Sequence, residues 1–260
     1  MLSFQAKIVK HVMRASSSKK TYTNTPVNTL RHNFDRNLTI MFPSTNRAIS
    51  QEHIAGVPVD VVTPKCDTGR AIVYVHGGGF ILGSVRSHRQ HIKRLAKLCK
   101  AKVYAIDYSL APESPYPIAL DQIQLVWEKL IADNTIDPRH AVFMGDSAGG
   151  NLALATLLRL RDRHIVMPSC LVMLSPGLDA TLSGSSHMSK ANSDPILNRS
   201  KLELFVNSYV GNASKQDPIV SPIFADLHSL PPMLVHVGSE ELLLSDSQTI
   251  TDHAKRDGVD

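Results

Sequence analysis

The sequence predicts an α/β protein built on one mostly parallel sheet that carries helices on both faces. Two observations predict it: short, near-continuous apolar runs recur from residue 57 onward, and stretches with helical periodicity separate them. Such strands are typical of a sheet that is covered on both sides. The composition agrees, because 43% of the 260 residues are apolar and 20% are charged. These values are ordinary for a globular protein and exclude collagen, a disordered chain and a coiled coil.

The predicted elements alternate along the chain after a polar stretch, residues 15–50, in which no period is sustained. The expected strands are 57–62, 71–75, 102–107, 141–144, 170–174 and 232–237. The expected helices are 87–99, 117–132, 148–163 and 245–256. The interval 176–231 breaks this alternation, contains several prolines and holds one helical stretch, 199–210. An insertion of that length predicts a functional lid rather than a structureless loop.

Positive charge is concentrated at the N-terminus. The net charge is +5, and the first twenty residues carry five cations and no acid: Lys7, Lys10, Arg14, Lys19 and Lys20. Phe4, Ile8 and Val12 recur at four-residue spacing, which predicts an amphipathic basic helix over residues 2–14. We expect this helix to lie on the rest of the protein; a membrane-surface anchor and a mitochondrial presequence are the alternatives. With so short a basic arm, no nucleic-acid partner is expected.

Cysteine usage and hydropathy indicate the compartment. No stretch of 18 apolar residues occurs, so we expect no stable membrane insertion, and the N-terminus lacks the apolar run of a secretory signal. Cys66, Cys99 and Cys170 are scattered and form no C-x-x-C pair. We therefore expect no disulfide framework and no zinc site, and a cytoplasmic location.

Three predicted strands end in unusual residues, and open α/β sheets bind ligands beyond the carboxyl ends of their strands. The strand 71–75 is followed by HGGGF (76–80), the strand 141–144 by GDSAG (145–149), and the strand 232–237 by GSEE (238–241). The second run is a G-x-S-x-G pattern between a strand and a helix. In that setting Ser147 is expected on a tight, strained turn with its hydroxyl exposed, as a nucleophile requires.

The glycines of HGGGF allow backbone N–H groups to approach an oxyanion without obstruction by a Cβ atom. A plain glycine turn and a dinucleotide fingerprint are the other interpretations of this run. The fingerprint fails on spacing, since G-x-G-x-x-G begun at Gly77 requires glycine where the chain has Leu82. Together the two motifs predict acyl transfer.

Five motifs, taken in order, resemble the hormone-sensitive-lipase-like family of serine esterases. They are HGGGF, DYSLAPESPYPIALD (107–121), GDSAGGNLAL (145–154), LSPGLD (174–179) and DPIVSPIFADLHSLPPMLVHVGSEELLLSDS (217–247). The resemblance implies an α/β-hydrolase fold, with residues 1–50 as an N-terminal cap segment, residues 51–260 as the core, and a cap insertion at about 180–215. By this resemblance Ser147 is the nucleophile. The implied oxyanion donors are Gly78, Gly79 and Ala148, and the implied site-shaping residues are His76, Gly77, Asp146 and Glu113.

The acid and the base follow less directly. The family places Asp-Pro-Leu after the seventh strand, where this chain has Glu240-Glu241-Leu242-Leu243. Aligning Leu243 with that leucine makes Glu241 the expected acid and Glu240 the second candidate, and either carboxylate could orient an imidazole. The only later histidine is His253, in an ordinary helical stretch, and the family's base lies beyond one further strand. We therefore expect the chain to end before its base, without the last strand and helix of the fold.

The implied activity is hydrolysis of short- to medium-chain acyl esters or lactones through an acyl-enzyme. It needs no cofactor and no metal; His88 and His91 have metal-ligand spacing but no evident carboxylate partner. Because a base is missing, we expect the 260-residue chain to be weak or inactive. The alternative is a ligand-binding, non-catalytic member of the fold, like the gibberellin receptors. The expected partner is a small-molecule ester; acyl and alcohol specificity and homo-oligomer formation stay open.

Overall fold

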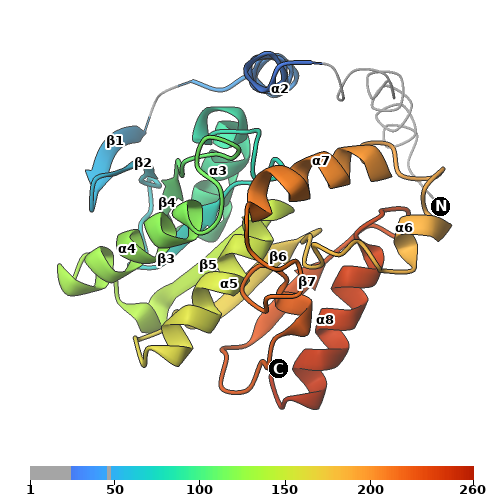
Figure 1. Ribbon diagram of the computed structural model, residues 1–260. Helices are drawn as coiled ribbons and strands as arrows, with labels where there is room; N and C mark the ends of the chain where they lie inside the picture. The colour runs from blue at the N-terminus through green and yellow to red at the C-terminus, as the bar shows by residue number, and fades with distance from the viewer. Residues whose placement is uncertain (1–24, 46–47) are drawn as a thin grey trace.

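The computed structural model describes residues 25–45 and 48–260, so the predicted helix 2–14 lies outside the described residues. A seven-stranded sheet in the order β1-β2-β4-β3-β5-β6-β7 runs through the centre of the described chain (Figure 1). The pairs β4-β3, β3-β5, β5-β6 and β6-β7 are parallel, whereas β1-β2 and β2-β4 are antiparallel. The prediction of an α/β protein with a mostly parallel sheet is confirmed.

The elements have the following bounds. The strands are β1 (Ile49–Ile54), β2 (Val57–Val62), β3 (Ala71–Val75), β4 (Lys102–Ile106), β5 (Ala141–Asp146), β6 (Cys170–Leu174) and β7 (Met233–His236). The α-helices are α2 (Val27–Met41), α3 (Val85–Cys99), α4 (Ile118–Ala132), α5 (Ala148–Asp162), α6 (Ser186–Ser189), α7 (Arg199–Val210) and α8 (Leu244–Arg256). Two 3₁₀ turns, η1 (Pro138–His140) and η2 (Pro222–Phe224), complete the description.

Every strand and helix expected from residue 57 onward is present, with ends shifted by no more than two residues. The expectation of an irregular segment at 15–50 was wrong, because α2 and the start of β1 fall within it. These elements were missed because they bury very few residues, and an exposed element has no apolar pattern. Leu30 is the only fully buried residue of α2, so the helix has no wide apolar stripe that would identify it. In β1 no residue is fully buried, and its sequence is correspondingly polar.

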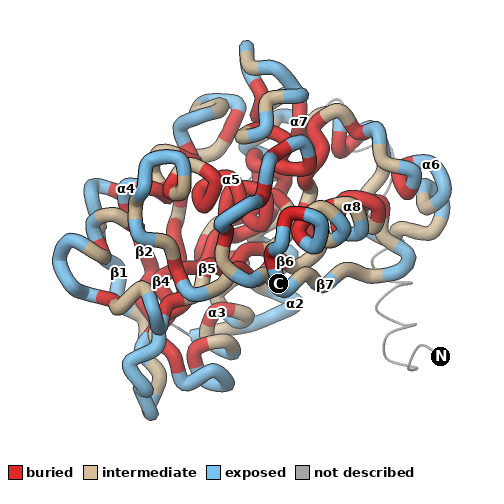
Figure 2. Tube along the Cα trace, turned by 90° about the horizontal axis from the view of Figure 1, so that it is seen from below, coloured by how far each residue is buried: buried red, intermediate tan, exposed pale blue. Residues whose placement is uncertain are grey.

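The sheet carries a core on each face. Along β3, Ala71, Val73 and Val75 belong to the larger core, while Ile72 and Tyr74 belong to the smaller one. Helix α3 packs on the smaller core, whereas α4, α5 and α8 contribute side chains to the larger one. Figure 2 shows the burial concentrated along the central strands and α5. This arrangement fixes the carboxyl ends of β3 and β5 as neighbouring, rigid supports.

The insertion between β6 and β7 contributes α6 and α7, and α7 lies across the sheet beyond the strand ends (Figure 1). Tyr209 of α7 stacks on Phe80 of the glycine-rich loop, with ring centroids 3.8 Å apart. At the far end of the sheet β7 is only half-buried, and Leu234 is 50% exposed. Within the described part of the chain, no helix is long and apolar enough to cross a membrane.

Candidate active site

Ser147 occupies the sharp turn between β5 and α5. Its backbone has φ 53° and ψ −120°, a conformation that L-residues rarely adopt, and its N–H donates to the Leu174 carbonyl of β6 at 2.8 Å. Glycine is required on both sides of this turn, because a side chain at either position would clash with backbone atoms. A Cβ atom on Gly145 would lie 2.3 Å from the Gly149 carbonyl oxygen, and one on Gly149 would lie 2.1 Å from the Val75 carbonyl oxygen. The turn therefore has the geometry expected of a nucleophile elbow.

Gly78 and Gly79 form the loop that follows β3. Both have positive φ values, 127° and 63°, and a Cβ atom on Gly78 would lie 2.1 Å from the Leu82 carbonyl oxygen. Within the described residues, the backbone N–H groups of Gly78, Gly79 and Ala148 donate no hydrogen bond. Gly79, Ser147 and Ala148 line the same cavity. Backbone donors of this kind are what an oxyanion requires.

The carboxylate of Asp146 connects the nucleophile turn to the glycine-rich loop. It accepts hydrogen bonds from the Gly77 N–H at 2.9 Å and the Tyr74 hydroxyl at 2.5 Å, and His88 Nε2 lies 3.5 Å away. Burial by itself would raise the pKa of Asp146, but the hydrogen bond and positive charge of His88 and the Tyr74 hydroxyl outweigh burial and lower it to about 2. Although burial lowers the pKa of His88, its interactions with Asp146 dominate and raise it. Asp146 is therefore an ionised support.

His76 lies behind the glycine-rich loop. It is fully buried, its Nδ1 lies 2.8 Å from the Gly77 carbonyl oxygen, and its ring stacks on Tyr108 at 4.3 Å. Burial, followed by the nearby His88, lowers the pKa of His76 to about 3. His76 is thus neutral at ordinary pH and supports the loop.

Glu113 does not contact the reacting atoms. Its carboxylate pairs with Arg31 of α2, at 2.6 Å from Nη2 and 2.9 Å from Nη1. Arg31 was missed by sequence reasoning because it lies 82 residues from its partner in a segment without periodicity. Nothing in the sequence indicated this contact beyond the presence of an arginine in a segment without periodicity.

The two acid candidates lie on the loop after β7. Glu241 is half-buried, and its Oε1 accepts a hydrogen bond from the Gly238 N–H at 2.8 Å, which fixes the loop locally. Glu240 is exposed. Leu243 and Asp246, the next residues along this loop and α8, line the cavity that contains Ser147. The segment that follows the two acid candidates therefore borders the same cavity as Ser147.

No described histidine hydrogen-bonds Ser147. Among residues 25–45 and 48–260, the Ser147 hydroxyl has no hydrogen-bond partner. His253 lies in the last turn of α8, roughly 10 Å along the helix from Asp246 at 1.5 Å per residue. His187, which the sequence reasoning missed, is buried 3.5 Å from Asp246 Oδ1. Burial raises the pKa of Asp246 despite this histidine.

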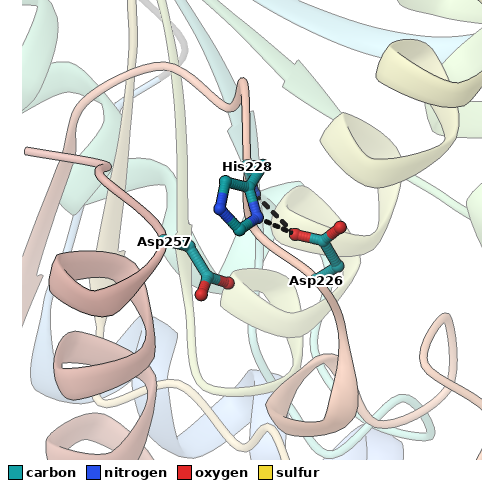
Figure 3. A group of neighbouring side chains, drawn as sticks. All are labelled: Asp226, His228 and Asp257. Carbon is teal, nitrogen blue, oxygen red and sulfur yellow. Dashed lines mark hydrogen bonds and ion pairs between the residues drawn. The ribbon is translucent and has the colours of Figure 1, made fainter.

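A separate group with metal-ligand chemistry lies where the loop before β7 meets the end of α8. Figure 3 shows Asp226, His228 and Asp257 turned toward one another. His228 Nδ1 lies 2.6 Å from Asp226, while Asp257 accepts from Arg256 and from the Leu227 N–H. These hydrogen bonds are sufficient to hold the three side chains close together without a metal ion. His88 has a carboxylate neighbour that was not evident from the sequence, because its Nε2 lies 3.5 Å from Asp146, whereas His91 packs on the Tyr74 ring at 5.5 Å.

The cavity beside Ser147 is small and mainly apolar, with a volume of about 40 Å³. Phe80, Phe205 and Tyr209 line it.

Residues 72–260 match a family model described as alpha/beta hydrolase fold. The chain belongs to this family. It is 37% identical over 250 residues to an esterase of Acinetobacter venetianus, and the aligned region covers 95% of this chain and 82% of that protein. It is also 34% identical over 198 residues to an acetyl-hydrolase of Streptomyces hygroscopicus, and here the aligned region covers 76% of this chain and 66% of that protein.

Solved structures agree. A crystal structure of an esterase from the bacterial hormone-sensitive lipase family has a TM-score of 0.91 and 32% identity, covering 100% of this chain and 86% of that one. An esterase/lipase from an uncultured bacterium gives a TM-score of 0.91 and 32% identity, covering 99% and 86%. The resemblance to hormone-sensitive-lipase-like esterases is confirmed.

Proposed function

We propose that this hydrolase cleaves short-chain acyl esters by attack of Ser147 on the ester carbonyl. The observation that carries the proposal is the strained serine turn, which shares a cavity with Gly79 of the glycine-rich loop and with Ala148. That the chain is a carboxylic-ester hydrolase of the serine type follows from its family and from relatives named as esterases.

In the first step the Ser147 Oγ bonds to the carbonyl carbon while its proton passes to a base. Negative charge moves to the carbonyl oxygen, and the N–H groups of Gly78, Gly79 and Ala148 are the proposed donors to it. Each donor of this type is typically worth about 2.7–4 kcal/mol in the barrier. The carbon–oxygen bond to the alcohol then breaks as the base returns its proton to the leaving oxygen, an acyl-enzyme remains, and water hydrolyses it to the acid and free Ser147. Glu241 is the proposed acid that orients the base, with Glu240 as second candidate.

The size of the cavity supports a short acyl chain. About 40 Å³ of space remains beside Ser147, and the side chains of Leu202, Phe205 and Val206 from α7 bound it. Relatives named acetyl-hydrolase and acetyl esterase point in the same direction. Because α7 belongs to the insertion, we propose that the insertion acts as a lid and limits the acyl chain.

A cytoplasmic location is proposed as well. Cys66 and Cys99 are exposed and all three cysteines are free, as a reducing compartment would maintain them.

The experiment is release of p-nitrophenol from acetate, butyrate and decanoate esters, measured for the chain and for Ser147→Ala. We expect release that requires Ser147 and falls with chain length, with slow turnover because no described histidine hydrogen-bonds Ser147. Release above the uncatalysed rate that is equal in both proteins would overturn the assignment of the nucleophile. Tight binding of an ester without Ser147-dependent release would favour the ligand-binding alternative.

A further inference from the structure

The side chain of Arg31 joins helix α2 to both loops that surround the oxyanion site. Its Nε donates to the Ile81 carbonyl at 2.8 Å, and its Nη2 donates to the Ala111 carbonyl at 2.7 Å. Ile81 follows the glycine-rich loop directly, and Ala111 lies in the loop after β4. One guanidinium therefore holds two backbone segments that are far apart in the sequence.

Glu113 fixes the orientation of this guanidinium. Its two carboxylate oxygens accept from Nη1 and Nη2, and the hydrogen bond from Arg31 lowers the pKa of Glu113. The Glu113 side chain is 57% exposed, so the ion pair itself adds little to stability. What a two-pronged pair adds is direction, because the planar fork of Arg31 must lie in the plane of the carboxylate.

The carbonyls held by Arg31 are coupled to the oxyanion glycines. The Leu82 N–H donates to the Gly78 carbonyl at 2.9 Å, closing the turn that contains Ile81, and the Ala111 N–H donates to the Phe80 carbonyl at 3.0 Å. Arg31 completes this connection by binding the carbonyls of Ile81 and Ala111 together. A shift of the Ile81 carbonyl would consequently rotate the peptide units that present the N–H groups of Gly78 and Gly79.

A second contact keeps α2 in register with the same segment. Ser84, which caps α3 just after the loop, donates its hydroxyl proton to Asp35 of α2 at 2.8 Å. Arg31 and Asp35 are one helical turn apart, so one face of α2 holds residues 81–84 at both ends.

We propose that Arg31 is a positioning residue for ester hydrolysis, which acts by fixing the N–H groups of Gly78 and Gly79 in the orientation that an oxyanion needs. Consecutive glycines have little conformational preference of their own, so their donors must be held from outside. Donors that are already oriented stabilise developing charge without reorganisation. This inference rests on the proposed function, since the oxyanion is formed by attack of Ser147.

The kinetic test is the rate of Ser147 acylation by p-nitrophenyl acetate in Arg31→Met, Arg31→Lys and the wild-type chain. Arg31→Met is expected to lower this rate by about 10- to 100-fold, the usual effect of a misplaced donor, with KM nearly unchanged. Arg31→Lys retains the charge but not the fork, and an intermediate rate is expected. The matched control is Arg36→Met, which removes the same charge from an exposed position of α2 and should leave the rate unchanged.

Amide hydrogen exchange supplies a readout that does not depend on turnover. In Arg31→Met we expect faster exchange at residues 78–82, with little change in the strand amides of β3 and β5. The proposal would be overturned if Arg31→Met acylated at the wild-type rate with unchanged exchange at 78–82. It would also be overturned if Arg36→Met lost as much acylation rate as Arg31→Met. Uniformly faster exchange would overturn it too, because Arg31 would then serve only global stability. A wild-type chain no faster than Ser147→Ala contradicts the proposed function, while exchange still decides the role of Arg31.

Discussion

Substitution of Asp146 by asparagine removes an ionised support from beside the nucleophile. The amide keeps an oxygen in the place of Oδ1, which accepts from both the Gly77 N–H and the Tyr74 hydroxyl. It cannot form an ion pair with His88, whose Nε2 lies 3.5 Å from Asp146 Oδ2. We therefore expect Asp146→Asn to fold, to be less stable, and to acylate Ser147 more slowly because the glycine-rich loop is held less firmly.

The size of the expected loss in the free energy of unfolding follows from the pKa of Asp146, which falls from 3.8 to about 2 in the folded protein. At 1.36 kcal/mol per pKa unit, the folded state favours the charged carboxylate by about 2 kcal/mol. With an unfolding entropy of about 2.1 cal/mol/K per residue, this loss lowers Tm by about 4 °C. A depressed carboxylate pKa contributes stability that is present above pH 3.8 and is lost as pH falls through about 2. The raised pKa of His88 contributes stability that is present below pH 6.5 and is lost as pH rises through that raised value.

The assay is urea unfolding at pH 5.5 and pH 8.5, because the positive charge of His88 is lost as pH rises through its raised pKa. We expect the difference between wild type and Asp146→Asn to be larger at the lower pH. Asp133→Asn is the matched control, because Asp133 pairs with Lys129 at 2.8 Å but both side chains are about half exposed. A loss below about 0.5 kcal/mol in Asp146→Asn, or one equal to that of the control, would refute the reasoning.

Three further predictions concern the turn, the acid and the cavity. Gly149→Ala should lower the free energy of unfolding by at least about 1–3 kcal/mol in urea, because its Cβ would lie 2.1 Å from the Val75 carbonyl oxygen; wild-type stability would contradict this geometry. In a chain that turns over, Glu241→Gln should lower kcat far more than Glu240→Gln, since a neutral amide cannot stabilise an imidazolium, and the reverse ranking would reassign the acid. Phe205→Ala should raise the decanoate-to-acetate ratio of kcat/KM by about tenfold or more, and an unchanged ratio would show that α7 does not limit the acyl chain.

The central strands and the nucleophile turn could be predicted from sequence because their constraints are local. The strand Ala71–Val75 is buried along its whole length, so it is apolar at every position. Gly145 and Gly149 are needed where a Cβ atom would meet backbone, and that requirement is visible as a fixed spacing around Ser147.

The rest depends on contacts between distant segments. Helix α2 buries only Leu30 completely, and Arg31, its principal contact with the oxyanion loop, is paired with Glu113 across 82 residues. No periodicity encodes such a contact. Likewise, Asp146 could be placed beside the site by its motif, but its partners Tyr74 and His88 come from β3 and α3 and became evident only in three dimensions.

The most direct test of the account is the identity of the residue modified when the 260-residue chain reacts with a fluorophosphonate. Intact-mass measurement gives the stoichiometry, and peptide mapping gives the position. The account predicts one adduct, at Ser147, that forms more slowly in the presence of p-nitrophenyl acetate and is absent from Ser147→Ala. An adduct at another residue, or labelling of Ser147→Ala at the wild-type rate, would contradict it.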